Sequence, residues 1–318
     1  MTLPELQTTV APLIAVAAFY RFWPLGDLPG LRHALQRLCD SNDACGILLI
    51  APEGINGTLA AQPASLDVVL AGIATLTGIV GLDARMSRTH ALPFKRMRVR
   101  IKNEIITLGE PGVDPARQAG IYVEPQDWNA LLADPDVLLI DTRNAYEVAA
   151  GTFKGAVDPG TSSFGDFPAF ARGLDRARHR KVAMFCTGGI RCEKASSLLL
   201  REGFEEVYHL KGGILKYLET VPEAESLWQG GCFVFDERVA VGHGLNALPV
   251  RTCVSCDGPL DAAAVQSPLY EDGVCCPGCA GTLGDRQKAS ARERQRQVGL
   301  ACARGVQHLG PKAMPEKP

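Results

Sequence analysis

The sequence predicts a protein of several domains: an α+β domain, a parallel α/β domain and a small cysteine-rich tail. Three observations support this prediction. The chain has 318 residues, which is enough for two or three domains. Apolar runs alternate with helical segments between about residues 120 and 229, as a parallel sheet requires. Two Cys-x-x-Cys pairs follow near the end of the chain. We therefore expect domains at 1–114, 120–229 and 230–318.

The first domain has the pattern strand, helix, two strands, helix and further strands. We expect strands at 13–22, 46–51 and 58–61, and amphipathic helices at 31–39 and 66–79. Asn56-Gly57, between the second and third strands, is typical of a hairpin turn. This order predicts a ferredoxin-like α+β sandwich. The segment 109–115, rich in Gly and Pro, then indicates a linker.

Basic residues gather near the end of this domain, although the formal net charge of the whole chain is only −2. Between Arg85 and Lys102 there are seven Lys or Arg and no Asp or Glu. In an extended strand, alternate side chains share one face, and the shared face here carries Arg96, Arg98, Arg100 and Lys102. Such a face suits the phosphate backbone of a nucleic acid. The alternative is an edge strand whose charges prevent aggregation.

The second domain contains a candidate nucleophile at the end of an apolar strand. Residues 181–185 form the strand, Cys186 follows it, and a Gly-Gly turn leads into a helical pattern. Turned-in backbone N–H groups and the start of a helix stabilise a thiolate, so we expect a lowered pKa for Cys186. The alternative is a buried structural cysteine on an ordinary turn.

The length of this loop favours one chemistry over another. Cysteine phosphatases place five residues between the cysteine and the arginine that closes the loop. Only four residues separate Cys186 from Arg191, which resembles the shorter loop of rhodaneses. The segment 137–148, with Asp141, Arg143 and Glu147, and the Gly-Gly turn after His209 also resemble rhodanese motifs. The resemblance implies a rhodanese-like parallel α/β domain. The sequence pattern itself predicts helices at 125–132, 167–178 and 193–202, between the apolar runs of that domain.

The tail has the spacing of a metal site. Nineteen residues separate the pair Cys253 and Cys256 from the pair Cys276 and Cys279. Two such pairs supply the four thiolates of a tetrahedral structural zinc site, so we expect a zinc-ribbon-like tail. Cys275 offers a substitute ligand in the second pair, and the alternative is a set of reduced or redox-active thiols. A helix expected at 285–304 carries several arginines, either as a second RNA contact or as a solvated helix.

Four segments together resemble a more specific family. They are Glu53-Gly54-Ile55-Asn56-Gly57, Phe94-Lys95-Arg96-Met97, the stretch from Asp141 to Glu147, and the loop from Cys186 to Lys194. The combination resembles the bacterial tRNA uridine hydroxylases, which contain a rhodanese domain. The resemblance covers most of residues 15–218. It implies oxygen-dependent hydroxylation of C5 of the wobble uridine in tRNA, with Cys186 at the nucleophile position.

That activity gives the candidate residues distinct expected roles. The thiolate of Cys186 adds to C6 of uracil or carries a persulfide, while Arg191 and the loop amides stabilise charge on O4. Asp141 and Arg143 are expected to position the loop. Cys192 either resolves an oxidised Cys186 as a disulfide or packs the helix onto the sheet as a small apolar residue, which is the interpretation we favour.

Two other functions remain open on the sequence alone. The first is a sulfurtransferase that carries a persulfide on the same loop and acts in tRNA thiolation or sulfur metabolism. The second is a zinc- and RNA-binding module with an inactive rhodanese domain, which the intact Cys186, Arg191 and Gly-Gly argue against. We expect molecular oxygen as co-substrate and no nucleotide cofactor.

The remaining expectations concern location and partners. No apolar run is long enough to span a bilayer, and the apolar segment 10–19 lacks the flanks of a signal peptide. We expect a cytoplasmic protein that acts on tRNA through the anticodon arm, with no membrane contact. The sequence does not identify a protein partner.

Overall fold

The computed structural model describes residues 13–89, 92–234, 239–248, 251–256, 258–260 and 262–304. The ends of the first and last predicted domains, at 1–12 and 305–318, lie outside the described residues, as does the start of the apolar segment 10–19. The chain forms two compact units, one ending at Ile105 and one beginning at Ile106. No helix among the described residues is long and apolar enough to cross a membrane.

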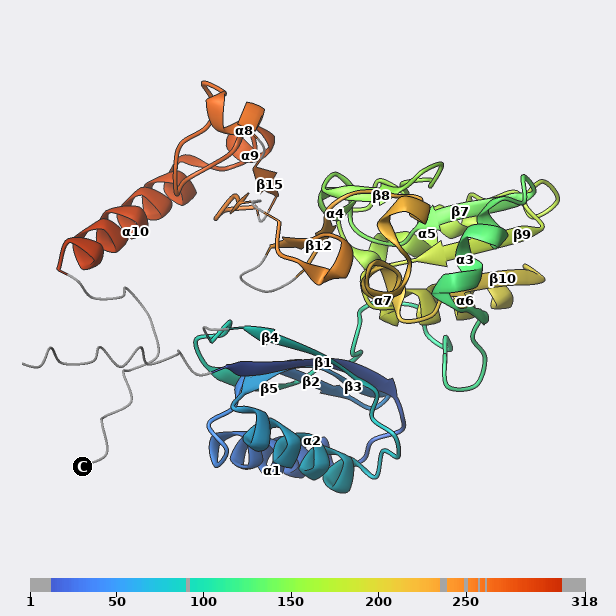
Figure 1. Cartoon of the computed structure of the whole chain (residues 1–318), viewed down its shortest axis with the longest axis horizontal. Helices are drawn as coiled ribbons and strands as arrows, with labels where there is room; N and C mark the ends of the chain where they lie inside the picture. The colour runs from blue at the N-terminus through green and yellow to red at the C-terminus, as the bar shows by residue number, and fades with distance from the viewer. Residues whose placement is uncertain are drawn as a thin grey trace, which may run out of the picture. The chain divides into compact units, whose positions relative to one another are not determined.

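The first unit is a five-stranded sheet with two helices on one face (Figure 1). Its strand order is β4-β1-β3-β2-β5, and β1 to β4 have the order and the antiparallel pairing of a ferredoxin-like βαββαβ sandwich. The predicted fold of this domain is therefore confirmed. Its elements are β1 (Ile14–Phe22), α1 (Leu28–Asp40), β2 (Cys45–Ala51), β3 (Gly54–Ala61), α2 (Pro63–Thr77), β4 (Ala84–Thr89) and β5 (Met97–Ile101).

One turn was predicted at the wrong place. Asn56 and Gly57 lie inside β3, where they pair with Leu49 and Leu48 of β2, and the chain reverses at Pro52 and Glu53 instead. Gly57 is needed for packing: a Cβ there would lie 2.6 Å from the Leu48 side chain. Gly57 is thus required by close packing in a central strand, and the prediction of a hairpin turn from the Asn-Gly pair was wrong.

The segment predicted as a linker, 109–115, lies inside the second unit, which begins at Ile106. Leu108 is buried in a core cluster of that unit, with Ile106 and Val113 packed beside it. The domain limits 1–114 and 120–229 remain predictions.

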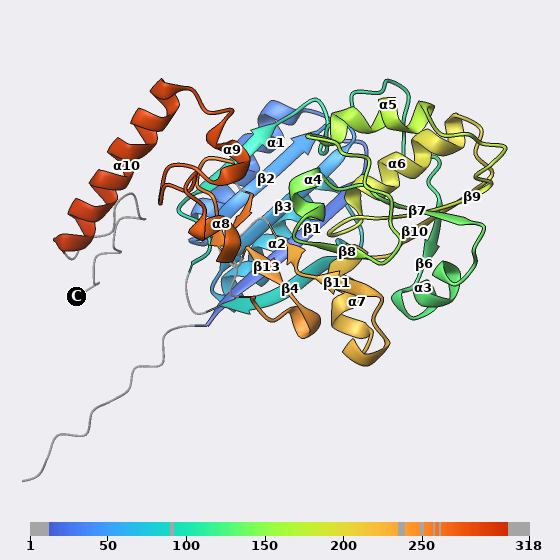
Figure 2. The ribbon, with the colours of Figure 1, turned by 90° about the horizontal axis from the view of Figure 1, so that it is seen from above.

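A parallel sheet of order β6-β10-β9-β7 forms the centre of the second unit. Helices α5 and α6 lie on one side of it and α3 and α7 on the other (Figure 2). This is the predicted α/β domain. Its elements are β6 (Ile121–Val123), α3 (Pro125–Leu132), β7 (Val137–Asp141), α4 (Ala145–Val148), β8 (Gly151–Phe153), η1 (Phe164–Asp166), α5 (Phe167–Arg172), β9 (Lys181–Phe185), α6 (Ile190–Arg201), β10 (Glu206–Leu210), α7 (Gly213–Thr220), η2 (Glu223–Glu225) and β11 (Trp228–Gly230).

Helix α5 is shorter than the predicted 167–178. It ends at Arg172, and the Asp175 carboxylate then accepts a hydrogen bond from the Ala177 N–H at 2.9 Å. Aspartate that bonds the backbone two residues ahead favours a turn over a helix.

The tail consists of short elements and one long helix. They are β12 (Cys232–Phe233), β13 (Ala240–Val241), η3 (His243–Leu245), β14 (Arg251–Thr252), β15 (Pro259–Leu260), α8 (Ala262–Gln266), α9 (Pro277–Ala280) and α10 (Asp285–Ala303). Strands β14 and β15 form an antiparallel pair. The predicted helix 285–304 corresponds to α10.

Candidate active site and nucleic-acid interface

Cys186 lies at the carboxyl end of β9, in the turn that leads to α6. The turn is closed by Gly189, whose φ of 104° lies in a region that glycine adopts far more readily than other residues. The Gly189 N–H donates to the Cys186 sulfur at 3.1 Å. The turned-in backbone N–H group that the sequence predicted beside the sulfur is therefore present. The Cys186 side chain is only 1% exposed.

Backbone N–H groups at the start of helix α7 bind the loop that carries Cys186. The N–H groups of Ile214 and Leu215 donate to the carbonyls of Cys186 and Thr187, at 2.9 and 3.1 Å. Gly213, with φ of +67°, makes this approach possible, because a Cβ there would lie 2.5 Å from the Cys186 carbonyl oxygen. The Gly-Gly turn after β10 therefore serves the nucleophile loop.

The surroundings of Cys186 favour its thiolate. Burial by itself raises the pKa of Cys186, but three effects outweigh it: a hydrogen bond from the Cys192 thiol, the positive charge of Arg191, and the backbone N–H groups of Cys192 and Gly189. Together they lower the pKa of Cys186 to about 5. Burial and the neighbouring Cys186 raise the pKa of Cys192 well above that of an ordinary thiol. The pair thus consists of a thiolate and a neutral thiol that donates to it.

Arg191 is held by a carboxylate that the sequence analysis did not assign to the site. Its guanidinium donates to both oxygens of Glu147, at 2.6 and 2.7 Å, and both side chains are buried. Burial alone raises the pKa of Glu147, but the hydrogen bond and charge of Arg191 outweigh this and lower it. Thr187 joins the pair, since its hydroxyl donates to Glu147 at 3.4 Å. Arg191 therefore acts on Cys186 as a fixed positive charge.

Asp141 and Arg143 form a second buried ion pair beside the first. Arg143 donates from Nε and Nη2 to the two Asp141 oxygens, at 2.9 and 2.6 Å, and both side chains are 0% exposed. Arg143 also donates to the backbone carbonyls of Glu147 and Gly151. These bonds fix the segment that carries Glu147.

Cys192 occupies a position that suits both roles considered for it. It is fully buried in the core cluster between α6 and the sheet, as a packing residue would be. Its sulfur also lies 3.5 Å from the Thr142 hydroxyl and its thiol donates to Cys186. All five predicted residues of the catalytic set thus meet at one edge of the sheet.

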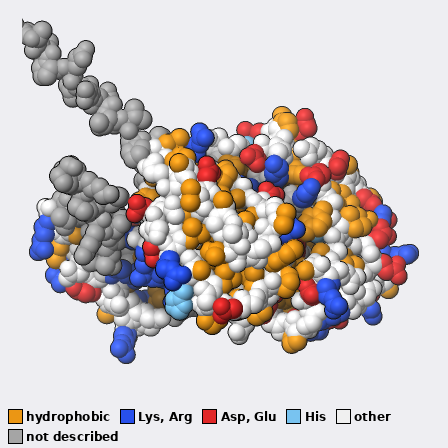
Figure 3. Space-filling view, turned by 90° about the horizontal axis from the view of Figure 1, so that it is seen from below, with side chains coloured by type: hydrophobic (Ala, Val, Ile, Leu, Met, Phe, Trp, Pro, Cys, Tyr) orange, Lys and Arg blue, Asp and Glu red, His pale blue; other side chains and the backbone are white. Residues whose placement is uncertain are grey.

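The predicted basic strand is β5, at the edge of the first unit. It pairs with β2 so that Arg98 and Arg100 stand beside Ile47 and Leu49, whereas Val99 is buried on the face that the helices cover. Arg96 and Lys102 flank the strand and, like Arg100, are exposed. Figure 3 looks at the side of the first unit that its helices cover, so the face of β5 that carries Arg98 and Arg100 points away from this view.

Two side chains of α1 cover the outer edge of β5. Gln36 accepts a hydrogen bond from the Val99 N–H at 3.2 Å, and Arg32 donates to the Val99 carbonyl at 3.3 Å. The middle of this edge is therefore already bonded, and the arginines are not needed there to block another strand.

Three basic residues of α10 bind partners within the tail. Arg292 binds Glu271, Arg296 binds Glu293, and Lys288 donates to the Ala280 carbonyl. This arrangement favours the solvated-helix interpretation for those three. The four predicted zinc ligands of the tail also come together.

Glu147 and Thr187 are the site residues that sequence reasoning missed. Glu147 stood in the motif segment but had no visible partner, because Arg191 is 44 positions away. The signal that could have found it was its place in the motif, because Glu147 follows Asp141 and Arg143 in the segment 137–148.

The fold and the site define a rhodanese-type protein with an additional N-terminal domain. A family model described as a rhodanese-like domain matches residues 124–220, and one described as a UPF0176 acylphosphatase-like domain matches residues 14–105. A solved rhodanese-related protein from Thermoplasma volcanium is 19% identical and covers 32% of this chain and 93% of its own, with a TM-score of 0.28, which by itself supports no statement about this chain.

Curated relatives extend the similarity to nearly the whole chain. Proteins named tRNA uridine(34) hydroxylase from Jannaschia sp. (strain CCS1) and Gluconobacter oxydans are 53% and 52% identical, over 94% and 93% of this chain and 99% and 96% of theirs. One from Rhizobium leguminosarum is 49% identical over 95% of this chain and 98% of its own. The chain belongs to the tRNA uridine(34) hydroxylase family.

Proposed function

We propose that this protein hydroxylates C5 of uridine 34 in tRNA, with molecular oxygen as co-substrate. The family membership and the thiolate-stabilising loop around Cys186 support the proposal. The loop is the main support for the proposal. A buried sulfur with a pKa of about 5 is ionised at neutral pH and is a strong nucleophile toward an electron-poor ring. The cytoplasm is the expected location, since tRNA is there.

In the proposed reaction, Cys186 activates the base. Its thiolate adds to C6 of uracil, and the electron pair of the C5–C6 bond moves to C5 and O4. C5 then takes up dioxygen and a proton to give a hydroperoxide. The loop N–H groups are the donors available to the developing anion, because Arg191 is occupied by Glu147.

Cys192 takes the redox role in this proposal, in place of the packing role favoured on the sequence, because its thiol donates a hydrogen bond to Cys186. It is then the source of electrons. Its thiol takes the outer oxygen of the hydroperoxide and becomes a sulfenic acid, which leaves a hydroxyl on C5. Loss of the C5 proton and of Cys186 restores the aromatic ring, and Cys186 condenses with the sulfenic acid to a disulfide and water. Overall, uridine, dioxygen and two thiols give 5-hydroxyuridine, water and one disulfide, which an external dithiol then reduces.

The charges of the site argue against a thiosulfate sulfurtransferase. Thiosulfate is a dianion and needs uncompensated positive charge beside the cysteine. Arg191 and Arg143 each carry a buried carboxylate partner, Glu147 and Asp141. With the thiolate present, these five groups sum to a net charge of −1, which suits a neutral uracil better than an anion.

We also propose that Arg96, Arg98, Arg100 and Lys102 contact the phosphates of the tRNA anticodon arm. The exposure of Arg96, Arg100 and Lys102, the partial exposure of Arg98 and the bonded outer edge of β5 support this role over edge protection. A single-stranded anticodon loop allows one base to turn out toward a catalytic pocket.

The reaction is tested on tRNA from a strain that lacks the gene. Liquid chromatography with mass spectrometry should detect 5-hydroxyuridine after complementation with the parent or with Cys302→Ser, which changes an exposed tail cysteine. Cys186→Ala and Cys192→Ala should restore none. Undiminished hydroxyuridine with Cys186→Ala would refute the role of the loop, and rapid thiocyanate formation from thiosulfate and cyanide would favour the sulfurtransferase.

RNA binding is tested by salt dependence. Replacing all four cations of β5 and its flanks with alanine should weaken tRNA binding and reduce the slope of log affinity against log salt by roughly 0.7–0.9 for each lost contact. The matched control replaces Arg286, Arg294 and Arg304 of the tail, and its slope should match that of the parent. The reverse result would move the RNA contact to α10.

A further inference from the structure

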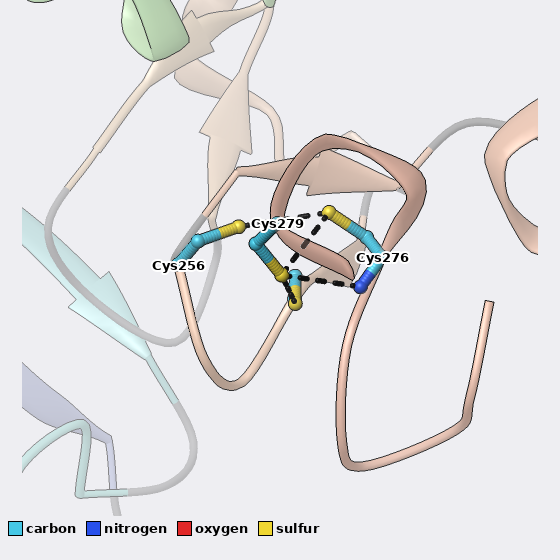
Figure 4. A group of neighbouring side chains, drawn as sticks. Cys256, Cys276 and Cys279 are labelled. Atoms are coloured by element: carbon cyan, nitrogen blue, oxygen red, sulfur yellow. Dashed lines mark hydrogen bonds between the residues drawn. The ribbon is translucent and has the colours of Figure 1, made fainter. Parts of the chain in front are cut away.

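Four cysteines from two separate turns of the tail meet around a common point. Cys253 and Cys256 follow β14, and Cys276 and Cys279 flank the start of α9, yet all four sulfurs lie within 4.8 Å of one another. Figure 4 shows the sulfurs of Cys256, Cys276 and Cys279 turned toward each other. We propose that these four thiolates bind one structural zinc ion, a site that the hydroxylation chemistry does not use.

The sulfur positions match the geometry of tetrahedral zinc. Zinc–thiolate bonds of about 2.3 Å place the four sulfurs of a tetrahedron about 3.8 Å apart. The sulfur–sulfur distances are 3.7 Å for Cys253 and Cys279, 3.6 Å for Cys256 and Cys276, and 3.8 Å for Cys276 and Cys279. Two disulfides would instead give two sulfur pairs about 2.05 Å apart. These three distances fit a single central ion.

The backbone around the cluster supports the charge that such a site requires. The N–H groups of Ser255 and Cys256 donate to the Cys253 sulfur, and the Cys276 N–H donates to Cys279 at 3.4 Å. Four thiolates and one divalent ion leave two negative charges, which N–H donors beside the sulfurs stabilise.

Cys275 is not part of the set, although the spacing alone allowed it. Its thiol donates to the Leu269 carbonyl at 3.6 Å, outside the four-sulfur cluster. It therefore offers a control on the same turn as the ligands.

The tail also needs a crosslink of this kind. Among the described residues, its core cluster buries four cysteines and, besides them, Leu260, Val274 and Ala291. A core of this size does not hold a subdomain together, and structural zinc commonly supplies the missing folding energy. Helix α10 docks on this core through Ala291 and through the Arg292–Glu271 ion pair. The ion would thus fix the position of α10.

The site is tested on the full-length protein purified under reducing conditions. Elemental analysis should find about one zinc per chain in the parent and in Cys275→Ser, and well under half of that in Cys256→Ser and Cys276→Ser. Growth with cobalt should give the absorption bands of tetrahedral cobalt thiolate in the parent and the control. Removal of zinc by a mercurial reagent should release one ion per chain and open α10 to protease.

A ligand variant can lose zinc simply because its tail no longer folds. The decisive measurement is therefore the zinc content of the parent. A parent that contains no zinc and gives no tetrahedral cobalt spectrum overturns the proposal. Stoichiometric iron with the absorption of an iron–sulfur centre also overturns it, since four thiolates suit that metal as well. A Cys275→Ser protein that loses its zinc shows that the ligand set is wrong.

Discussion

Removing the charge of Arg191 should raise the pKa of Cys186 and slow its alkylation. The suitable change is Glu147→Gln together with Arg191→Met, because removing only one partner would leave a buried unpaired charge. A positive charge about 4–6 Å from an acid lowers its pKa by about 1–3 pH units. The hydrogen bonds from Cys192 and Gly189 remain, so the pKa should rise from about 5 but stay below that of a free thiol.

The change is large enough to measure at neutral pH. At pH 7 a thiol with a pKa of about 5 is about 99% thiolate, and an ordinary thiol with a pKa of about 8.5 is about 3% thiolate. The double variant should therefore lose up to about tenfold in the rate of Cys186 alkylation by iodoacetamide. Mass spectrometry of the Cys186 peptide across pH 4–9 gives the rate and the pKa together.

The control is Arg201→Met, which removes an exposed arginine at the far end of the same helix. It should leave the Cys186 titration unchanged. An apparent pKa near 8.5 in the parent, or equal pKa values in the parent and the double variant, would refute the electrostatic argument.

The free energy of unfolding should depend on the ionisation of Cys186. The folded-state pKa of Cys186 lies below that of an unfolded thiol, so the thiolate's contribution is fully present above about pH 8.5 and is lost as pH falls toward 5. Between these values the stability of the parent relative to Cys186→Ser should rise with pH in chemical denaturation. A difference that is independent of pH would contradict the lowered pKa.

Three further predictions concern the supports of the site and of β5. Asp141→Asn leaves Arg143 buried with a neutral partner and should lower the free energy of unfolding by about 3–5 kcal/mol in urea titrations; a loss below about 1 kcal/mol would show that the pair is dispensable. Gly213→Ala should reduce both stability and Cys186 alkylation, whereas Gly155→Ala, at a positive φ with open space around it, should cost stability only. Gln36→Ala exposes the Val99 N–H and should cost about 1 kcal/mol in thermal unfolding; no change would mean that water replaces the amide.

The parts of the fold that depend on local pattern were predictable from the sequence. The strand 181–185 and the turn that follows it are encoded by consecutive apolar residues and glycines, and the structure places β9 and Cys186 there. The cysteine cluster was also predictable, because its two pairs each form a turn whose geometry is fixed locally.

What could not be predicted depends on contacts between distant segments. Glu147 meets Arg191 because β7 and β9 are neighbours in the sheet, and no local pattern reports that pairing. Gly57 was misread for the same reason, since the Leu48 side chain that requires a glycine belongs to another strand. The covering of β5 by Gln36 joins residues 63 positions apart.

The hydrogen bonds from α7 to the nucleophile loop also make a built-in reporter of motion. The amide hydrogens of Ile214 and Leu215 are bonded to the carbonyls of Cys186 and Thr187, and they exchange with solvent only when those bonds open. Deuterium uptake at these two amides therefore measures how often the loop separates from its support. Substrate that locks the loop would slow this uptake, and the slowing would be visible without any chemical turnover.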